Sequence, residues 1–191
     1  MHPIRLAAAL AGLSLLIAPP AGAQGLNDTQ GLAGALGLAA PPPPPLPAGT
    51  PAPAFATTSV AGKPLSLRGL RGKVVLLDYW ATWCGPCRMA TPTLQALHRQ
   101  FGAKGLAVVG LSVDDPSTVP QVRPFLKRMG VTYTVAASPR ANARAAQAYR
   151  VDGIPSQYLI DKKGVVRWSQ GGYSPAERQE LAVLIRKLLA E

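Results

Sequence analysis

The chain has 191 residues, of which 48% are hydrophobic, so it is long enough for one domain with a buried core. Twenty Lys and Arg residues against nine Asp and Glu residues give a formal net charge of +11. The basic residues are scattered and are not interleaved with aromatic residues, which argues against a nucleic-acid-binding protein and indicates a surface suited to acidic partners or anionic lipid. Only two cysteines are present, which excludes a framework of several disulfides.

Residues 1–23 have the pattern of a secretory signal peptide. Arg5 supplies a positive charge, residues 6–18 are apolar, and residues 21–23 (Ala-Gly-Ala) are the small residues that a signal peptidase reads. The apolar run is shorter than the about 20 residues that span a bilayer. We therefore expect cleavage before Gln24 and export to the periplasm, with retention of the segment as a membrane anchor as the alternative.

Residues 24–52 form a linker rich in proline, glycine and alanine, which we expect to be disordered. The five consecutive prolines at 41–45 cannot donate backbone hydrogen bonds and favour an extended polyproline II path. Residues 53–191 are predicted to form the single folded domain.

Within this domain, runs of apolar residues with strand and helix periodicity alternate. The expected strands are 54–58, 63–67, 74–80, 106–113, 131–136, 156–161 and 165–171. The expected helices cover 85–101, a segment containing Val122, Phe125, Leu126 and Met129, 141–149, and a last helix that opens at the capping box Ser174-Pro175-Ala176-Glu177 and buries Leu181, Leu184, Ile185 and Leu188. This alternation predicts an α/β fold with a mixed central sheet flanked by helices.

The two cysteines, Cys84 and Cys87, stand where the buried strand 74–80 gives way to a helix. At a helix N-terminus the unpaired N–H groups and the helix dipole favour a thiolate, which is the form that attacks disulfides. Cys87, one turn further on, would then attack the mixed disulfide formed at Cys84. Gly85 permits close approach of a partner chain, and Pro86 is tolerated in a first helical turn.

Metal binding is the main alternative use of such a pair. Zinc requires four ligands, and the only histidines are His2, in the signal segment, and His98. Cu(I) needs only two or three sulfur ligands, so copper delivery through the pair, with Met89 as a possible third ligand, stays open. A purely structural disulfide is disfavoured because so short a loop constrains little chain entropy. The sequence predicts no resident metal and no cofactor.

The segment Trp80-Ala-Thr-Trp83-Cys84-Gly-Pro-Cys87 after an apolar strand resembles the thioredoxin active site, and Gly153-Ile154-Pro155 stands where that fold has its cis-proline loop. Further features resemble the secreted TlpA/ResA/CcmG-like thiol–disulfide oxidoreductases: the export signal and the segments 62–67, 72–75, 114–149 and 158–164. The resemblance implies a thioredoxin fold with an N-terminal β-hairpin and a central strand–helix insertion, and a redox-active disulfide between Cys84 and Cys87.

The resemblance also implies roles for residues around the pair. A cis bond before Pro155 would place the backbone of Ile154 beside the cysteines, where it pairs with a substrate chain. Trp83 is expected to be exposed and to line the docking groove. Asp78 is a lone acid in an apolar strand and matches the buried acid of thioredoxins, so we expect it to accept the proton of Cys87. A structural acid satisfied by the backbone or a lysine is the alternative for Asp78.

The predicted function is reduction of protein disulfides in the bacterial cell envelope, in cytochrome c maturation or a similar process. Electrons would then come from a DsbD-like membrane donor, and we expect the chain to be a monomer. Ala90 occupies a position where many secreted relatives carry glutamate, which places narrow cytochrome specificity in doubt. A peroxiredoxin-like peroxide reductase is a second alternative, although Ala81 replaces the threonine that such enzymes carry three residues before their cysteine.

Overall fold

The computed structural model describes residues 44–191, and the predicted signal peptide and most of the linker lie outside them. In chain order the larger elements are β1 (Ala56–Thr58), β2 (Pro64–Ser66), β3 (Val74–Trp80), α2 (Gly85–Phe101), β4 (Leu106–Ser112), α3 (Val122–Arg128), β5 (Thr134–Ala136), α4 (Pro139–Ala148), β6 (Ser156–Ile160), β7 (Val166–Gly171) and α5 (Glu177–Ala190). Short 3₁₀ turns, η1 (Arg68–Leu70), η2 (Gly102–Lys104) and η3 (Val119–Gln121), lie between them.

A five-stranded sheet in the order β5-β4-β3-β6-β7 forms the centre of the domain. Strands β3, β4 and β5 are parallel, whereas β6 is antiparallel to β3 and β7 is antiparallel to β6. Strands β1 and β2 form a separate antiparallel hairpin. The α/β thioredoxin fold predicted from the sequence, with its N-terminal hairpin and central insertion, is therefore confirmed.

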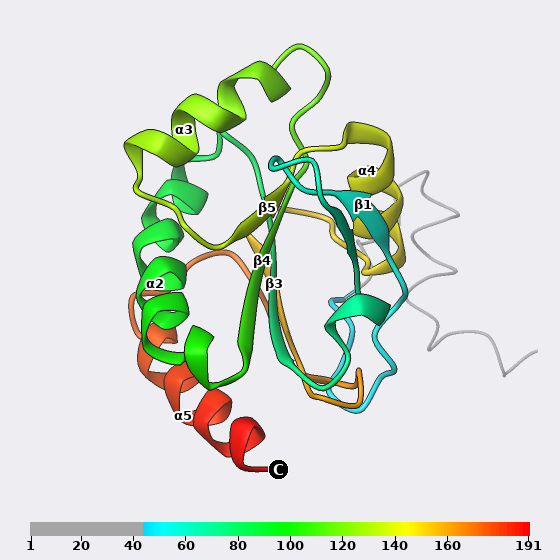
Figure 1. The fold of residues 1–191 in the computed structure, drawn as a ribbon, viewed down its shortest axis with the longest axis vertical. Coiled ribbons are helices and arrows are strands. Elements are labelled where there is room, and N and C mark those ends of the chain that lie inside the picture. Colours follow the sequence, from blue (N-terminus) through cyan, green and yellow to red (C-terminus); the bar gives the residue numbers. More distant parts are fainter. Residues whose placement is uncertain (1–43) are drawn as a thin grey trace, which may run out of the picture. The chain divides into compact units, whose positions relative to one another are not determined.

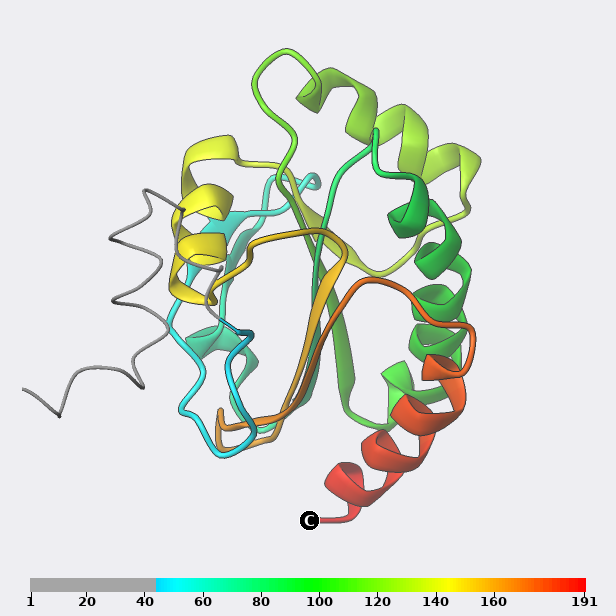
Figure 2. The ribbon, with the colours of Figure 1, turned by 180° about the vertical axis from the view of Figure 1, so that it is seen from behind.

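Helices cover both faces of the sheet (Figures 1 and 2). Helices α2 and α5 lie against one face, and α4 lies on the other together with the β1–β2 hairpin. Alternate residues of β3 point to the two cores, so that Leu76 and Trp80 belong to the core beneath α2 and α5, and Leu77 and Tyr79 belong to the core beneath α4. Because both faces are covered, all seven residues of β3 are buried, which explains its nearly continuous apolar sequence.

Several predicted boundaries differ from the structure. The strand expected from residue 131 begins only at Thr134, because the backbone N–H of Thr132 donates to the side chain of Gln95 and is not available to a sheet. The last helix begins at Glu177, two residues after the predicted proline start. Helix α2 continues through Pro92 as one element over 17 residues.

The packed chain begins earlier than the predicted boundary at Pro53. Leu46 is 4% exposed and joins the core beneath α4. The N–H of Gly49 donates to the carbonyl of Val166, and the N–H of Ala52 donates to that of Gly164. Residues 46–52 therefore line the β6–β7 hairpin as part of the domain. No helix within residues 44–191 is long and apolar enough to cross a membrane.

Candidate active site

The two cysteines lie at the junction of β3 and α2. Cys84 is the N-cap residue of α2, with extended backbone angles, and Cys87 occupies its first turn. Their Sγ atoms are joined in a disulfide of 2.05 Å. Both residues are largely buried in this oxidised state, at 5% exposed for Cys84 and 2% for Cys87. The pair thus lies buried at a helix N-terminus, while its neighbours Trp83, Gly85 and Pro86 are exposed.

The sulfur of Cys84 lies next to two backbone polar groups, one N–H and one carbonyl. The backbone N–H of Cys87 donates to Sγ of Cys84 at 3.1 Å, which occupies one of the free donors of the helix N-terminus. The same sulfur lies 3.7 Å from the carbonyl oxygen of Ile154. The Ile154–Pro155 peptide bond is cis, as the resemblance implied. The two segments that the sequence separates by 70 residues therefore meet at Cys84.

A buried carboxylate, Asp114, holds the loop that presents the disulfide. It accepts hydrogen bonds from the backbone N–H of Thr82 at 3.0 Å, from the Thr82 hydroxyl at 2.6 Å and from the Ser112 hydroxyl at 2.7 Å. The carbonyl of Thr82 in turn accepts from Nε and an NH₂ nitrogen of Arg88, at 3.1 and 2.9 Å. The backbone N–H and the backbone carbonyl of Thr82, two residues before Cys84, are therefore both held by side chains.

Sequence reasoning missed this network. Asp114 follows β4 in an Asp-Asp-Pro segment that reads as a turn, and it lies 32 residues from Thr82 in sequence. The contact arises because Trp80 and Ser112, the last residues of β3 and β4, are partners in the parallel register. The signal that could have found it is the rule that the carboxyl ends of adjacent parallel strands meet at one edge of a sheet.

Asp78 lies in the middle of the sheet and is 3% exposed. Strand alternation places it on the same face as Trp80, the face covered by α2, whose core includes Cys87. Its cross-strand neighbour on β6 is Gln157, a second buried polar residue that the sequence analysis did not single out. Burial raises the pKa of Tyr133 well above its ordinary value, and the nearby charge of Asp78 raises it further.

An apolar groove of about 720 Å³ opens beside the disulfide loop. Trp83, which is 60% exposed, and Ile154 form its boundary with the disulfide. The remaining lining residues come from α4, the end of β4 and the loop before the cis bond: Val113, Ala143, Ala146, Gln147, Val151, Asp152 and Gly153. Gly85 and Pro86, which follow Cys84, are exposed, and a Cβ atom added at Gly85 would meet no atom within 4 Å. Of the site residues predicted from the sequence, Trp83 and Ile154 line this groove and Cys84 lies beside Ile154, whereas Asp78 lies in the buried interior.

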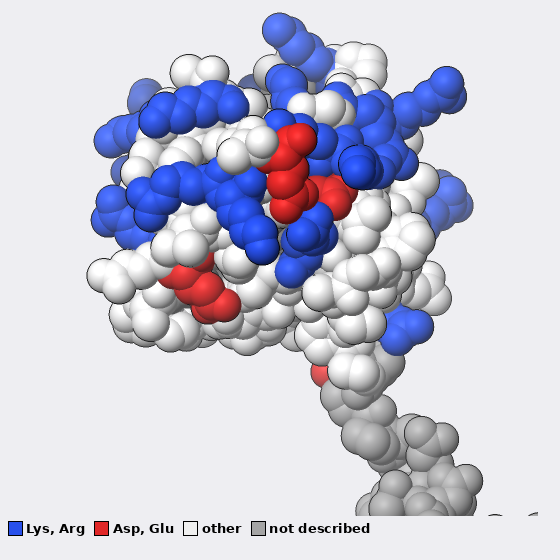
Figure 3. All heavy atoms as spheres, turned by 90° about the horizontal axis from the view of Figure 1, so that it is seen from below, with Lys and Arg blue, Asp and Glu red and all other residues white. Residues whose placement is uncertain are grey.

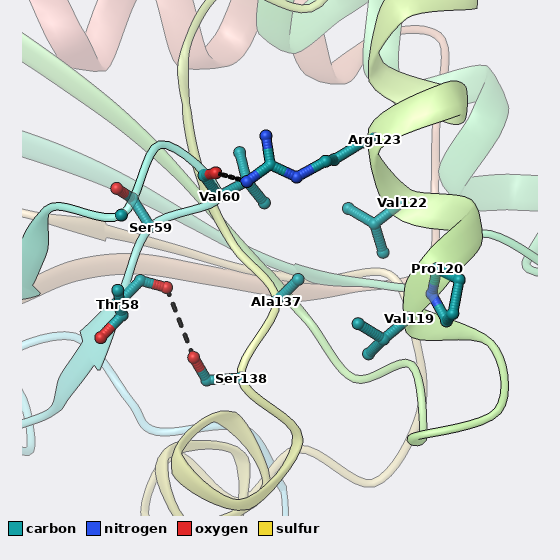
Figure 4. Close-up of a pocket in the computed structure, with 10 residues that line it drawn as sticks. Thr58, Ser59, Val60, Val119, Pro120, Val122, Arg123, Ala137 and Ser138 are labelled. Atoms are coloured by element: carbon teal, nitrogen blue, oxygen red, sulfur yellow. Dashed lines mark hydrogen bonds between the residues drawn. The ribbon is translucent and has the colours of Figure 1, made fainter.

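A second pocket, of about 330 Å³, lies between the β1–β2 turn and α3 (Figure 4). Arg123 reaches across it and donates to the carbonyl of Val60. The pocket contains neither cysteine nor any other residue predicted for the site. Within residues 44–191 no group of three or more His, Cys, Asp or Glu side chains is arranged to hold a metal ion.

Comparisons with known proteins agree with this geometry. Residues 48–169 match the model of the AhpC/TSA family. The chain is 34% identical over 118 residues to the thiol–disulfide oxidoreductase ResA of Bacillus cereus, a match that covers 62% of this chain and 66% of ResA, just under two thirds of that relative's length. It is 35% identical over 121 residues to the thioredoxin-like protein YneN of Bacillus subtilis, which covers 62% and 68% of the two chains.

A solved structure of a thiol:disulfide interchange protein DsbE from Chlorobium tepidum is 34% identical, with a TM-score of 0.69. That match covers 75% of this chain and 99% of the other. A structure of a protein disulfide isomerase from Bacteroides thetaiotaomicron is 33% identical, with a TM-score of 0.69, and covers 76% of this chain and 92% of the other.

Proposed function

This chain belongs to the AhpC/TSA family, among its thiol–disulfide oxidoreductases, and we propose that it is an exported reductase of protein disulfides in the bacterial cell envelope. The observation that carries the proposal is the Cys84–Cys87 pair at the N-terminus of α2, with the carbonyl of Ile154 beside Cys84. Cytochrome c maturation, or another process that needs reduced cysteines in that compartment, is the role we assign to it.

The proposed reaction begins with the reduced pair. The Cys84 thiolate attacks one sulfur of a substrate disulfide, a bond forms between Cys84 and that sulfur, and the other substrate sulfur leaves as a thiolate. The Cys87 thiolate then attacks Sγ of Cys84, which releases the second substrate thiol and leaves the Cys84–Cys87 disulfide seen in the structure. Two electrons pass from the pair to the substrate. The N–H of Cys87 supports the Cys84 thiolate before attack.

Trapping the intermediate tests this order of attack. A Cys87→Ser variant should accumulate a mixed disulfide with a reducible protein substrate, because no second thiol can resolve it, whereas Cys84→Ser should form none. Non-reducing electrophoresis after acid quenching measures both. Equal trapping by the two variants would contradict the assignment of Cys84 as the attacking residue.

Asp78 is proposed as the proton acceptor for Cys87. The support is that Asp78 is buried on the face of β3 that also carries Trp80, and Cys87 belongs to the core on that face. A carboxylate at such a place is costly unless it is paired or protonated, which favours uptake of a proton. An Asp78→Asn variant should resolve the mixed disulfide more slowly near neutral pH. The deficit should disappear at high pH, where Cys87 ionises without help. An unchanged rate at every pH would show that Asp78 does not accept the proton of Cys87.

The apolar groove beside Trp83 is proposed to receive the substrate chain. The backbone of Ile154, which is half-buried beside Cys84, offers hydrogen-bonding groups to an extended segment, and Trp83 supplies an apolar wall next to Cys84. After each turnover, a DsbD-like membrane donor that uses the same opening would reduce the Cys84–Cys87 disulfide again. A monomer leaves this opening accessible to both partners in turn.

Two other chemistries were open from the sequence. Peroxide reduction is disfavoured because Ala81, three residues before Cys84, is buried and has no hydroxyl to orient a peroxide. Peroxide consumption by the reduced chain at a rate above that of free dithiol would revive that chemistry. Copper delivery would appear as tight Cu(I) binding by the reduced pair in competition with a chelator.

A further inference from the structure

The end of the domain opposite the disulfide is built from three turns and the end of one helix, which meet there. The N–H of Val74, at the start of β3, donates to the carbonyl of Gly105, and the N–H of Gly72 donates to that of Lys162. Nζ of Lys162 donates to the carbonyl of Leu189 near the end of α5. The turns before β3 and β4, the β6–β7 turn and the end of α5 therefore form one continuous surface.

This surface is strongly basic (Figure 3). Six exposed cations come from its turns and helix end, and they define what we call the basic end: Arg68, Arg71, Lys73, Lys104, Lys163 and Lys187. Two carboxylates, Asp161 and Glu191, lie among them, and both form ion pairs with a further cation, Arg167. These two carboxylates therefore pair with Arg167 and not with the six cations of the basic end.

The basic end and the disulfide lie at opposite ends of β3. Cys84 follows the last residue of β3, whereas Lys73 immediately precedes its first. Seven residues at about 3.3 Å each separate the two ends by about 20 Å. A partner bound at the basic end would therefore leave the groove beside Trp83 open.

The shape and connections of the basic end favour a lipid surface as that partner. Its cations come from separate turns, and none of them lines the groove beside Trp83 or the pocket at Arg123. One of them, Arg71, donates to the carbonyl of Lys163 in the β6–β7 turn. Long Lys and Arg side chains spread over turns suit headgroups that rearrange around them. The segment 46–52 runs along β7 from Ser169 and reaches this turn at Ala52, whose N–H donates to the carbonyl of Gly164.

We propose that the basic end docks on anionic phospholipid headgroups and holds the domain with Cys84 facing away from the bilayer. The attraction is electrostatic and screened over about 10 Å at 0.1 M salt, so it weakens as salt rises. Docking would confine diffusion of the domain to the membrane surface and leave Cys84 open to substrates in the aqueous compartment. It does not require the reductase assignment, because it depends only on surface charge.

Vesicle partitioning of the full chain tests the proposal. Vesicles with about one third phosphatidylglycerol in phosphatidylcholine should retain at least about ten-fold more protein than pure phosphatidylcholine, and added salt should reduce the difference. The triple variant Lys73→Glu, Lys163→Glu and Lys187→Glu should lose more than about ten-fold of this partitioning, since each cation near an anionic surface contributes roughly five-fold. Any insertion of residues 6–18 would be the same in both vesicle types and in all variants.

The matched control reverses three exposed cations on α3 and α4: Lys127, Arg128 and Arg140. It has the same net charge as the first variant and should lose less than about three-fold, because its changes face away from the lipid. A second basic-end variant carries alanine at the same three lysines, in case the glutamate variant does not fold. An unchanged rate of attack on a small disulfide would show that each of the two basic-end variants is folded. The emission of exposed Trp83 should not be quenched by brominated lipid.

Three results would overturn the proposal. Equal losses in the basic-end and control variants would mean that net charge alone governs binding. Equal retention by anionic and neutral vesicles would show that the basic end does not bind anionic headgroups. Retention on immobilised poly-glutamate that depends on the same lysines, without partitioning onto the anionic vesicles, would assign the basic end to an acidic protein.

Discussion

Asp114 provides a direct test of how the loop before the disulfide is held. Replacing it with alanine removes the acceptor for the backbone N–H of Thr82 and for the hydroxyls of Thr82 and Ser112. The hydroxyls can rotate toward other acceptors, but the buried N–H cannot, and loss of its hydrogen bond to a charged acceptor costs about 1.5–3 kcal/mol. Asparagine retains one oxygen for the N–H, so we expect the smaller loss of about 1–2 kcal/mol.

The rate of attack on a substrate disulfide should fall with the loop order. Stopped-flow measurement of the reduced chain against a protein disulfide should give at least about a ten-fold loss for Asp114→Ala, because misplacement of a reacting group by about 1 Å can cost that much or more. The Asp114→Asn variant should fall between the alanine variant and the native chain. Denaturant unfolding at the same temperature verifies that each variant is folded during the rate measurement.

Asp161→Asn is the matched control. Asp161 is also a buried carboxylate that accepts from two backbone N–H groups, those of Lys163 and Val165, and from Arg167, but it lies at the opposite end of the sheet. Its replacement should lower stability without slowing attack on the substrate. If Asp114→Ala and Asp161→Asn slowed the reaction equally, or if Asp114→Ala left the rate unchanged, the positioning role of Asp114 would be refuted.

Three further predictions concern packing, substrate docking and pH. Gly110→Ala should destabilise the domain by about 1–3 kcal/mol in denaturant unfolding, because the added carbon would lie 2.9 Å from Nε1 of buried Trp80; an unchanged midpoint would contradict this. Ala143→Arg should raise the KM for a protein disulfide but not for a small one, whereas Ala148→Arg, on the same helix but outside the groove, should do neither. Stability measured against pH should decline below about pH 4. Burial raises the pKa of Asp161, but its hydrogen bonds outweigh burial and hold that pKa below the usual value, so the stabilisation is present above the unfolded-state pKa and is lost as pH falls through the folded one. Asp161→Asn should flatten that decline.

The features that the sequence predicted well are local. The Cys84–Cys87 spacing, the apolar run of β3 and the glycine-proline pair at a helix start are contained within a few residues, and they placed the disulfide at the N-terminus of α2. The cis bond before Pro155 followed from a resemblance and not from physical chemistry, because trans is the common state of such bonds.

The features that the sequence did not predict depend on strand register and on helix placement. Asp114 reaches Thr82 only because β3 and β4 pair so that their last residues are adjacent. Gln157 becomes the neighbour of Asp78 through the antiparallel register of β6. The groove requires α4 to lie beside Trp83, which no local pattern encodes. Such contacts join residues tens of positions apart, and periodicity within one element does not specify them.

The start of the packed chain was predicted wrongly for a related reason. The residues before Pro53 look like a linker because prolines and small residues dominate them, yet Leu46 is buried and the segment after it pairs with the β6–β7 hairpin. One apolar side chain and a few backbone hydrogen bonds to a distant strand are enough to order such a segment. The amino-acid composition of the segment indicates neither of these contacts.

The central claim is that the Cys84–Cys87 pair works as a reductant. Its most direct test is the reduction potential, measured by equilibrating the purified chain with glutathione at fixed ratios of reduced to oxidised form and quantifying the two states. We predict a value near that of thioredoxin, about −270 mV, so that the dithiol passes electrons to substrate disulfides. A value near that of DsbA, about −120 mV, would contradict the account and make the chain an oxidant.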